Sequence, residues 1–411
     1  MDIAVIGAGA AGLMAAIQAA RARPGRRVVA FDGARTLGAK ILVAGGGRCN
    51  VTHFQVTPED FHGSSRKAIG KVLRQFDVEE TTHFFREIGV ELKREDTGKL
   101  FPTTDRARTV LEALVDAAQA AGVELRTGAR VEGIETARGA KRFRVEGSWG
   151  SESAALVVVA TGGRSLPKTG SDGLGYDLVR RLGHTLSPRV TPALVPLLLP
   201  PEHPLLDLSG LSASVTLEVR AASGRRLEEV SGSLLLTHFG LSGPAALDVS
   251  RLWIHANFDD PGARLVVNWL PTVSRESLDL ELRGLGRQSV ARSLSRFLPD
   301  RLTRTLCALA NVAPDLEGAY LDRNRRLALL KVLLELELPI TGDRGYSYAE
   351  VTAGGVPLSQ IDLANMESRL CPGLFLCGEI CDVDGRIGGF NFQWAWSSGT
   401  VAGKGAAATY A

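Results

Sequence analysis

Three glycines near the start of the chain have a spacing that suits phosphate binding. Gly7, Gly9 and Gly12 form the pattern G-x-G-x-x-G. Gly7 would allow a tight turn, Gly9 would let a pyrophosphate approach the backbone, and Gly12 would let a helix pack closely on a strand. The first N–H groups of that helix would then face the phosphates. The spacing predicts a dinucleotide site, although the pattern alone is a weak signal.

The segments around these glycines have the composition that such a site needs. The apolar run 3–6 is typical of a buried parallel strand, and residues 13–22 have a helical pattern. A second strand, 27–31, ends in Asp32, which lies 20 residues after Gly12. A carboxylate at this spacing would accept hydrogen bonds from ribose hydroxyls. Because an acid disfavours a 2′-phosphate, FAD or NAD is favoured over NADP.

A second glycine-rich segment, 45–50, follows this first strand–helix–strand unit and reads Gly-Gly-Gly-Arg-Cys-Asn. Three consecutive glycines are costly to order and cannot build a core. We therefore expect their backbone to lie against a flat ligand or phosphates, with Arg48 and Asn50 as hydrogen-bond donors. A flexible surface loop is the alternative interpretation.

Two later segments return the chain to the same kind of structure. The apolar strand 156–160 ends in Thr161-Gly162-Gly163, and the strand 374–377 ends in Gly378-Glu379. Glu379 would bind a ribityl hydroxyl, and the N–H groups of residues 388–391 at a helix start would stabilise negative charge on a reduced flavin. A plain NAD dehydrogenase needs no such closure, so these segments favour FAD.

The middle of the chain differs from both ends. Short alternating segments between residues 214 and 269 predict strands, and helical periodicity follows from 274 to 338. His238 lies between the two parts, in a segment that continues with Gly240, Ser242, Gly243 and Pro244. It is a candidate general acid near a flavin, whereas most isolated histidines are structural or simply exposed.

Composition and charge exclude several classes of protein. The 411 residues carry a net charge of +3 and are 45% hydrophobic, without an apolar run of about 20 residues that could span a membrane. Segment 283–331 holds ten basic and four acidic residues. This excess indicates either a solvated helix face or an anionic partner such as RNA, although no RNA-binding motif accompanies it.

Cysteine use predicts a reducing compartment. The five cysteines are scattered at positions 49, 307, 371, 377 and 381, which does not suit a disulfide framework. The pair Cys377 and Cys381 lacks the CxxC spacing of a redox dithiol and any nearby histidine cluster, so we expect buried small side chains and no metal site. The N-terminus reads directly into a strand without a secretory signal, and we expect a cytoplasmic protein.

Together these segments resemble a known family. The motifs at 7–12, 45–50, 161–163, 238–244 and 378–399 are similar to those of the bacterial NAD(P)/FAD-dependent flavoproteins typified by the 3-dehydro-bile-acid reductase-like proteins. The resemblance spans nearly the whole chain, and the stretches Gly-Gly-Gly-Arg-Cys-Asn and Gly-Gly-Phe-Asn-Phe-Gln-Trp-Ala-Trp-Ser-Ser-Gly are its most specific parts.

The resemblance implies an α/β fold: a two-dinucleotide-binding-domain-type, Rossmann-like FAD domain with an inserted β-barrel and a small inserted helical domain. The expected boundaries are 1–190 and 346–411 for the FAD-binding domain, 191–272 and 336–352 for the β-barrel, and 273–335 for the helical insertion. We expect the following residues to bind FAD: Gly7, Gly9, Ala10, Ala11, Gly12, Asp32, Lys40, Gly46, Gly47, Arg48, Cys49, Asn50, Arg130, Val131, Thr161, Gly162, Gly378, Glu379, Gly388, Gly389, Phe390 and Asn391.

Activities attached to this family differ, so several functions stay open. One is a reductase in which NAD(P)H, bound transiently, reduces FAD, which then reduces an electron-poor C=C bond of a small molecule. The alternatives are dihydrouridine formation in ribosomal RNA, amine oxidation, and a non-enzymatic RNA- or protein-binding module that holds FAD. The sequence does not indicate the oligomeric state.

Overall fold

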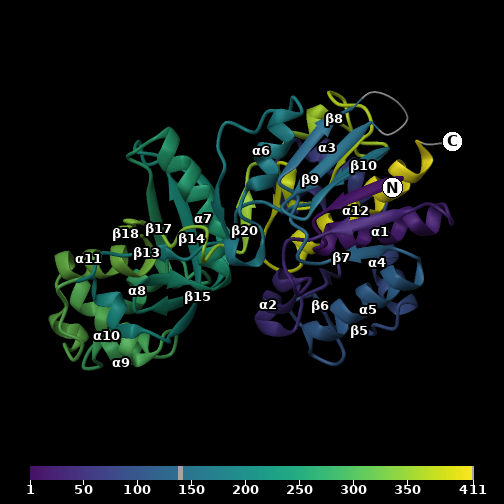
Figure 1. Cartoon of the computed structure of the whole chain (residues 1–411). Helices are drawn as coiled ribbons and strands as arrows, with labels where there is room; N and C mark the ends of the chain where they lie inside the picture. Colours follow the sequence, from purple (N-terminus) through teal and green to yellow (C-terminus); the bar gives the residue numbers. More distant parts are fainter. Residues whose placement is uncertain (138–141, 410–411) are drawn as a thin grey trace. The chain divides into compact units, whose positions relative to one another are not determined.

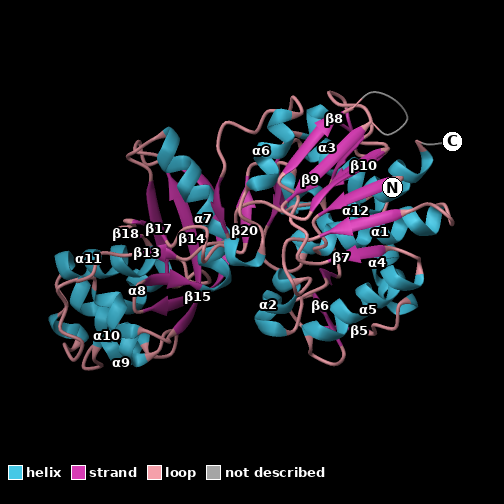
Figure 2. Cartoon of the chain, in the orientation of Figure 1, coloured by secondary structure: helices cyan, strands magenta, loops and turns pink. Residues whose placement is uncertain are grey.

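The computed structural model describes residues 1–137 and 142–409. The chain divides into two compact units, which Figure 1 colours by sequence. The first unit joins both ends of the chain, Met1–Pro192 and Ala349–Ala411, and the second unit is the intervening segment Ala193–Tyr348. Figure 2 shows helices and strands in each unit.

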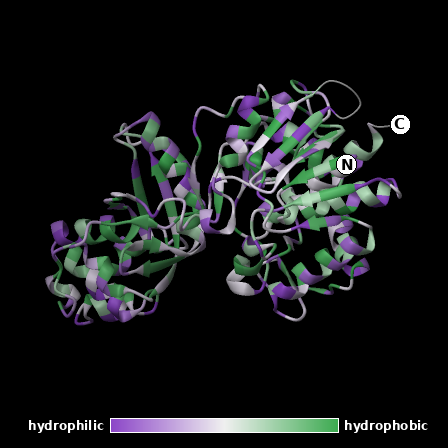
Figure 3. Cartoon of the chain, viewed as in Figure 1, coloured by the Kyte–Doolittle hydropathy of each residue, from purple (hydrophilic) through white to green (hydrophobic). Residues whose placement is uncertain are grey.

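The first unit is built on a mostly parallel seven-stranded sheet. Its strands lie in the order β21 (Ile361–Asp362), β22 (Glu367–Ser368), β23 (Leu374–Leu376), β11 (Leu156–Val159), β1 (Ile3–Ile6), β2 (Val28–Phe31) and β7 (Glu124–Arg126). The five strands from β23 to β7 run parallel, and β1, β2, β11 and β23 are buried throughout. Strands covered on both faces are nearly all apolar, and Figure 3 colours this region as hydrophobic.

Helices cover this sheet and also join the two ends of the chain. The helices of the first unit are α1 (Ala10–Ala22), α2 (Ala39–Gly47), α3 (Arg66–Leu73), α4 (Val78–Glu87), α5 (Ala107–Ala120), α6 (Leu174–Arg181) and α12 (Phe390–Ala408). Helix α12 packs so closely on α1 that a Cβ atom at Gly399 would lie 2.5 Å from the Ala11 carbonyl oxygen, and one at Gly403 would lie 2.3 Å from that of Ala15. Glycine is therefore required where the C-terminal helix meets the first helix.

Smaller sheets of two or three strands complete the first unit. They are the meander β8 (Gly133–Thr136), β9 (Phe143–Gly147) and β10 (Gly150–Ala154), the sheet β3 (Thr52–His53), β6 (Lys99–Pro102) and β5 (Leu92–Arg94), and the pair β4 (Phe61–Gly63) and β24 (Val383–Gly385). Strands β12 (Thr191–Ala193) and β20 (Val351–Ala353) lie where the chain passes from one unit to the other.

The second unit contains a seven-stranded antiparallel sheet. Its strands lie in the order β18 (Leu336–Leu338), β17 (Arg264–Asn268), β14 (Ser212–Arg220), β15 (Arg226–Thr237), β16 (Gly240–Ser242), β13 (Leu197–Leu198) and β19 (Gly342–Asp343). Helix α7 (Gly243–Asp259) packs on β14 and β15. Among the described residues the end strands β18 and β19 do not pair with each other, so the expected closed barrel is not confirmed.

A helical segment is inserted between β17 and β18. Its helices are α8 (Arg275–Arg283), α9 (Val290–Leu294), α10 (Asp300–Leu309) and α11 (Arg323–Leu334). Each has a buried leucine side, which packs the segment into one core, and α11 also contacts β17 and β18. The helices belong to the same compact unit as the sheet. The division of this unit into two separate insertions stays a prediction.

Candidate functional site

The four motifs predicted from distant parts of the sequence follow four neighbouring parallel strands. Ile6 is paired with Phe31 on β2 and with Val159 on β11, which is paired with Leu376 on β23. Gly7, Asp32, Ala160 and Cys377 follow these residues directly. Because parallel strands end at one edge of the sheet, the glycine loop, Asp32, the Thr161 turn and the Gly378 turn lie together there. Ligands of open α/β folds bind at this edge, where the order of strands reverses around β1.

The first glycine loop has the conformation that its spacing predicts. Gly7 has a φ of 95°, and a Cβ there would lie 2.6 Å from the Ala160 carbonyl oxygen. A Cβ at Gly12 would lie 1.8 Å from the Gly7 carbonyl oxygen, so helix and strand touch at this point. A Cβ at Gly9, in contrast, would meet no atom within 4 Å. Two of the glycines are needed by the fold, whereas Gly9 leaves open space beside the backbone.

Helix α1 begins at this open space without a capping side chain. Its N-cap is Gly9, and the first bond of the helix runs from the Leu13 N–H to the Gly9 carbonyl. The described part of the chain supplies no acceptor for the N–H groups of residues 10–12. Unpaired N–H groups at a helix start bind anions, which is the chemistry that a pyrophosphate requires.

Asp32 braces the loop through both of its carboxylate oxygens. Oδ2 accepts a hydrogen bond from the Ala8 N–H at 2.9 Å, and Oδ1 accepts one from the Ala34 N–H at 2.8 Å. Each oxygen keeps a lone pair, so binding of ribose hydroxyls stays a prediction. The Ala129 N–H donates to the Asp32 carbonyl. This bond places the neighbouring segment that holds the predicted contacts Arg130 and Val131 beside Asp32.

The Arg130 side chain is directed to another partner, since Nη2 lies 2.5 Å from Asp172 Oδ2. Val131 is buried. The segment thus lies beside Asp32, and contact of Arg130 and Val131 with the cofactor stays a prediction. The sequence did not indicate the Arg130–Asp172 ion pair.

The second glycine segment interrupts helix α2, because the backbone leaves the right-handed helical region from Ala44 onward. Gly45, Gly46 and Gly47 all have left-handed backbone angles, with φ values of 58°, 68° and 84°. Cys49 also has a positive φ of 61° and is fully buried, and desolvation raises the pKa of its thiol to about 12. Cys49 is thus a protonated packing residue at neutral pH rather than a reactive thiol.

The two predicted donors of this segment, Arg48 and Asn50, behave differently. Arg48 donates to Glu95 at 2.6 Å, and its guanidinium lies over the Phe101 ring at 4.0 Å. Asn50 is 8% exposed, and its side-chain oxygen has no partner among the described residues. The chain itself therefore holds Arg48, whereas Asn50 keeps a buried oxygen that a ligand could satisfy.

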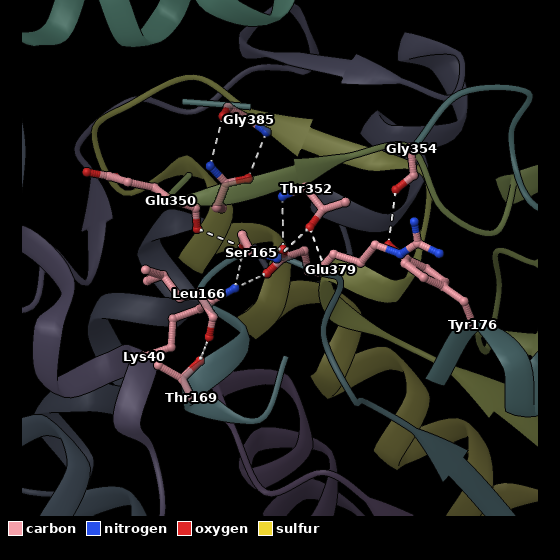
Figure 4. A network of polar contacts seen from close by, with 12 residues as sticks. Lys40, Ser165, Leu166, Thr169, Tyr176, Glu350, Thr352, Gly354, Glu379 and Gly385 are labelled. Carbon is pink, nitrogen blue, oxygen red and sulfur yellow. Dashed lines mark hydrogen bonds and ion pairs between the residues drawn. The ribbon is translucent and has the colours of Figure 1, made fainter. Parts of the chain in front are cut away.

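Lys40 and Glu379, both predicted to contact the cofactor, contact each other (Figure 4). Lys40 Nζ lies 2.7 Å from Glu379 Oε2 and 2.7 Å from Ser165 Oγ. Glu379 Oε1 accepts hydrogen bonds from Ser165 Oγ and from the Thr352 N–H, at 2.8 and 2.9 Å. The Glu379 carboxylate therefore ties together four segments of the first unit. Its contact with a ribityl chain stays a prediction.

The C-terminal return is fixed by glycines and by indole donors. A Cβ at Gly378 would lie 2.7 Å from the Ala11 Cβ, and one at Gly389 would lie 2.6 Å from the Thr52 backbone. The indole of Trp394 donates to the Gly378 carbonyl at 3.0 Å. These contacts hold residue 378 against α1 at the first glycine loop, and they hold the start of α12 against β3.

Two of the predicted contacts at the start of α12 have structural partners. Phe390 is 1% exposed. The Asn391 amide forms two hydrogen bonds, both of 2.8 Å, with the backbone of Gly385. Helix α12 has no side-chain cap, so its backbone N–H groups are the donors that this end of the helix offers to a ligand.

Buried polar atoms without partners give a direct test of whether a cofactor fits. The hydroxyl groups of Thr161 and Ser171 are buried and have no hydrogen-bond partner among the described residues, like the side-chain oxygen of Asn50. Buried polar groups without a protein partner are usually satisfied by ordered water or by a ligand. Together with the space at Gly9 and the uncapped helix α1, they fit a dinucleotide with a polar chain.

The sequence did not indicate two charged residues near this site. The Lys99 side chain passes Gly388, where a Cβ would lie 3.8 Å from Lys99 Cε. Glu350 is exposed at the surface, but the surrounding protein desolvates its carboxyl and raises its pKa, while the charges of Lys99 and Lys40 oppose this rise. Lys99 reaches Gly388 because β3 pairs with β6, which places His53 opposite Lys99. This pairing of distant segments was not evident in the sequence.

The candidate catalytic residue His238 lies in the second unit. It occupies the two-residue turn between β15 and β16 with Phe239, and its side chain is exposed. The imidazole contacts the Phe239 ring edge-on, with 5.0 Å between the ring centroids. The structure places His238 on a tight turn, and its role in catalysis stays a prediction.

The excess of arginines in segment 283–331 is balanced in part by carboxylates. Arg326 pairs with Asp279 at 2.8 Å, and Arg304 pairs with Asp300 at 2.9 Å. Asp279 also pairs with Arg283. Because Asp279 lies outside the segment, the sequence count overstated the free positive charge. The solvated helix face is therefore favoured over an RNA-binding surface.

Comparison with known proteins identifies the family. The HI0933-like protein Rossmann domain matches residues 1–405. The chain belongs to this family. Over 410 residues it is 33% identical to 3-dehydro-bile acid delta(4,6)-reductase of Clostridium scindens, and the match covers 98% of each chain. It is 34% identical over 400 residues to ribosomal RNA dihydrouridine synthase of Escherichia coli, covering 97% of this chain and 96% of the relative.

A solved structure supports the fold. The chain has a TM-score of 0.53 to 3-ketosteroid delta1-dehydrogenase of Sterolibacterium denitrificans in complex with 1,4-androstadiene-3,17-dione, with 13% identity and 99% coverage of both chains. The family resemblance and the Rossmann-like α/β fold are thus confirmed. In residues 1–137 and 142–409, no helix is long and apolar enough to cross a membrane, and no cluster of His, Cys, Asp and Glu is placed to hold a metal ion.

Proposed function

We propose that this FAD-dependent oxidoreductase reduces a C=C bond conjugated with a carbonyl group in a small unsaturated ring compound. The observation that carries the proposal is the fit at the sheet edge: open space at Gly9, an uncapped helix α1, and buried unpaired oxygens at Asn50 and Thr161. A relative of 33% identity over the full chain is named for reducing such bonds. Bound FAD would supply hydride transfer.

The residues of the first unit would hold and orient the cofactor. In this proposal the backbone at Gly9 and the first turn of α1 bind the pyrophosphate, and Asp32 accepts the ribose hydroxyls. The first N–H groups of α12, at Gly389 and Phe390, would stabilise negative charge on the reduced ring. NAD(P)H as the transient reductant is part of the proposal.

The second unit would supply the proton for the carbon next to the one that receives hydride. His238 is the proposed donor, because its side chain is exposed on a tight turn and histidine is the common general acid of enzymes.

The direct test follows the flavin without any nicotinamide. The purified enzyme is photoreduced under anaerobic conditions and mixed with a steroid 4,6-dien-3-one, and the visible absorbance of oxidised flavin is recorded. If the absorbance of oxidised flavin returns and the product is two hydrogens heavier than the steroid substrate, the proposal is supported. Return only with unmodified ribosomal RNA would instead support dihydrouridine formation, and return only with oxygen would indicate an oxidase. Either of these results would overturn the small-molecule reductase.

A further inference from the structure

An arginine of the second unit lies over two aromatic rings beside His238. The Arg344 guanidinium carbon is 4.2 Å from the centre of the Phe239 ring and 3.4 Å from that of Tyr348. The backbone is fixed as well, because the Arg344 N–H donates to the Pro196 carbonyl at 3.1 Å. These contacts hold a flat cation in one orientation.

The donors of this guanidinium have no acceptor among the described residues. The neighbouring carboxylate of Asp343 accepts instead from the Gly345 N–H, at 2.7 Å. This differs from Arg304 and Arg326 in the same unit, which pair with aspartates. A half-buried guanidinium that stacks on rings and lacks a carboxylate partner presents its N–H groups to a ligand, and two parallel N–H groups match a carboxylate.

The cluster is also open to a ligand and adjacent to the proposed proton donor. Tyr348 is 51% exposed, so its ring edge is accessible. Phe239 contacts both His238 and Arg344, and the two distances place the imidazole and the guanidinium within about 9 Å of each other. A ligand anchored at Arg344 would therefore have its acidic group close to the atom that His238 protonates.

We propose that Arg344, held by Phe239 and Tyr348, binds the carboxylate of a small, flat, unsaturated ring acid. The inference rests on the proposed function for the identity of the reducible bond, and it narrows the substrate to an acid whose carboxylate lies a few bonds from that C=C. The side chains of Phe239 and Tyr348 would contact the apolar ring of the ligand, and Arg344 would select the acid over its neutral analogues.

The test measures equilibrium binding to the oxidised FAD enzyme, so it does not require turnover. The probes are 3-oxocyclohex-1-ene-1-carboxylate and its methyl ester, titrated by calorimetry. We expect the wild-type protein to bind the acid about tenfold more tightly than the ester, and Arg344→Met to abolish this preference while leaving ester affinity within about twofold, as expected for loss of one charge-assisted contact.

Two further variants distinguish recognition from packing. Arg344→Lys keeps the charge but not the planar pair of donors, so it should recover only part of the preference. Arg287→Met, which removes an unpaired arginine of the helical segment, should leave the preference unchanged. Equal binding of acid and ester by the wild type, equal loss of both in Arg344→Met, or no measurable binding of either probe would overturn the inference. A failure to reduce the probes despite selective binding would count against the proposed function alone.

Discussion

The glycine loop of the first unit (residues 7–12) and the cluster of Arg344, Phe239 and Tyr348 in the second unit are proposed to recognise ligands in opposite ways. In the loop, the first turn of α1 offers unpaired backbone N–H groups, while the N–H of Gly7 donates to the Phe31 carbonyl. Gly7 and Gly12 leave no space for a side chain, and Gly9 leaves space that a ligand would fill. In the cluster, the exposed or half-buried side chains of His238 and Arg344 stand on a fixed turn and strand end. The contrast teaches that, under these proposals, cofactor binding would depend on the path of the chain, whereas substrate choice would depend on a few side chains.

This difference has a practical consequence for variants. A side-chain replacement in the second unit should leave the fold and the flavin intact, because His238 and Arg344 carry no part of either core. A replacement at the glycines of the first unit should act on the fold or on the cofactor. If variants of the two regions changed flavin content and fold stability alike, this difference between the regions would be contradicted.

The largest effect is expected at His238. His238→Ala should retain flavin content and reduction by NAD(P)H, but should slow reoxidation by the unsaturated substrate by about 10²–10⁴-fold, the span for loss of a general acid. Stopped-flow absorbance measures both half-reactions. The matched control His83→Ala removes an exposed histidine of α4 and should change neither. Equal slowing of both half-reactions would mean that His238 shapes the flavin site, and no slowing would make it a structural residue.

A smaller effect is expected at Lys99, which lies beside Gly388 and has no ion pair among the described residues. Its positive charge would stabilise the negative charge of the reduced flavin. Lys99→Met should therefore lower the two-electron reduction potential by about 30 mV, which corresponds to about 1.4 kcal/mol. Lys71→Met, which removes an exposed lysine of α3, is the control. An unchanged potential in Lys99→Met would place the lysine away from the ring.

The smallest effect concerns a buried histidine of the first unit, which contrasts with the exposed His238. His184 is 3% exposed and contacts Gln360 and Ser368, and desolvation lowers its pKa despite the hydrogen bond to Gln360. The unfolded chain then binds more protons than the folded one, so stability falls as the pH drops through 6.5. His184→Asn should flatten this dependence by about 1 kcal/mol or less in the free energy of unfolding, measured by urea titration at several pH values. A free energy of unfolding that depends on pH as strongly in His184→Asn as in the wild type would contradict this prediction.

The sequence predicted the parts of the site that depend on the backbone. The spacing of Gly7, Gly9 and Gly12, the acid at Asp32 and the strand ends before Thr161 and Gly378 were sufficient, because parallel strands bring their carboxyl ends to one edge. These features depend only on local conformation and on strand order. Both can be predicted from the hydrophobic pattern and from the positions of the glycines.

The side-chain partners could not be predicted in the same way. Lys40 and Glu379 are 339 residues apart and meet only because both ends of the chain form one unit. Arg48 was expected to face the ligand but pairs with Glu95, and Arg326 of segment 283–331 pairs with Asp279, which lies outside that segment. Such pairs depend on tertiary contacts that leave no periodic signal in the sequence.

Flavin content of Gly9→Val tests most directly the claim that the first unit binds FAD through its backbone. Gly9 has a φ of −80°, and a side chain there meets no protein atom, so the variant should fold with the thermal stability of the wild-type apoprotein. It should nevertheless be colourless after purification, because valine would fill the space for the pyrophosphate. Gly284→Val, at a position with ordinary contacts in the second unit, should stay yellow. A folded Gly9→Val protein with one FAD per chain would contradict the account.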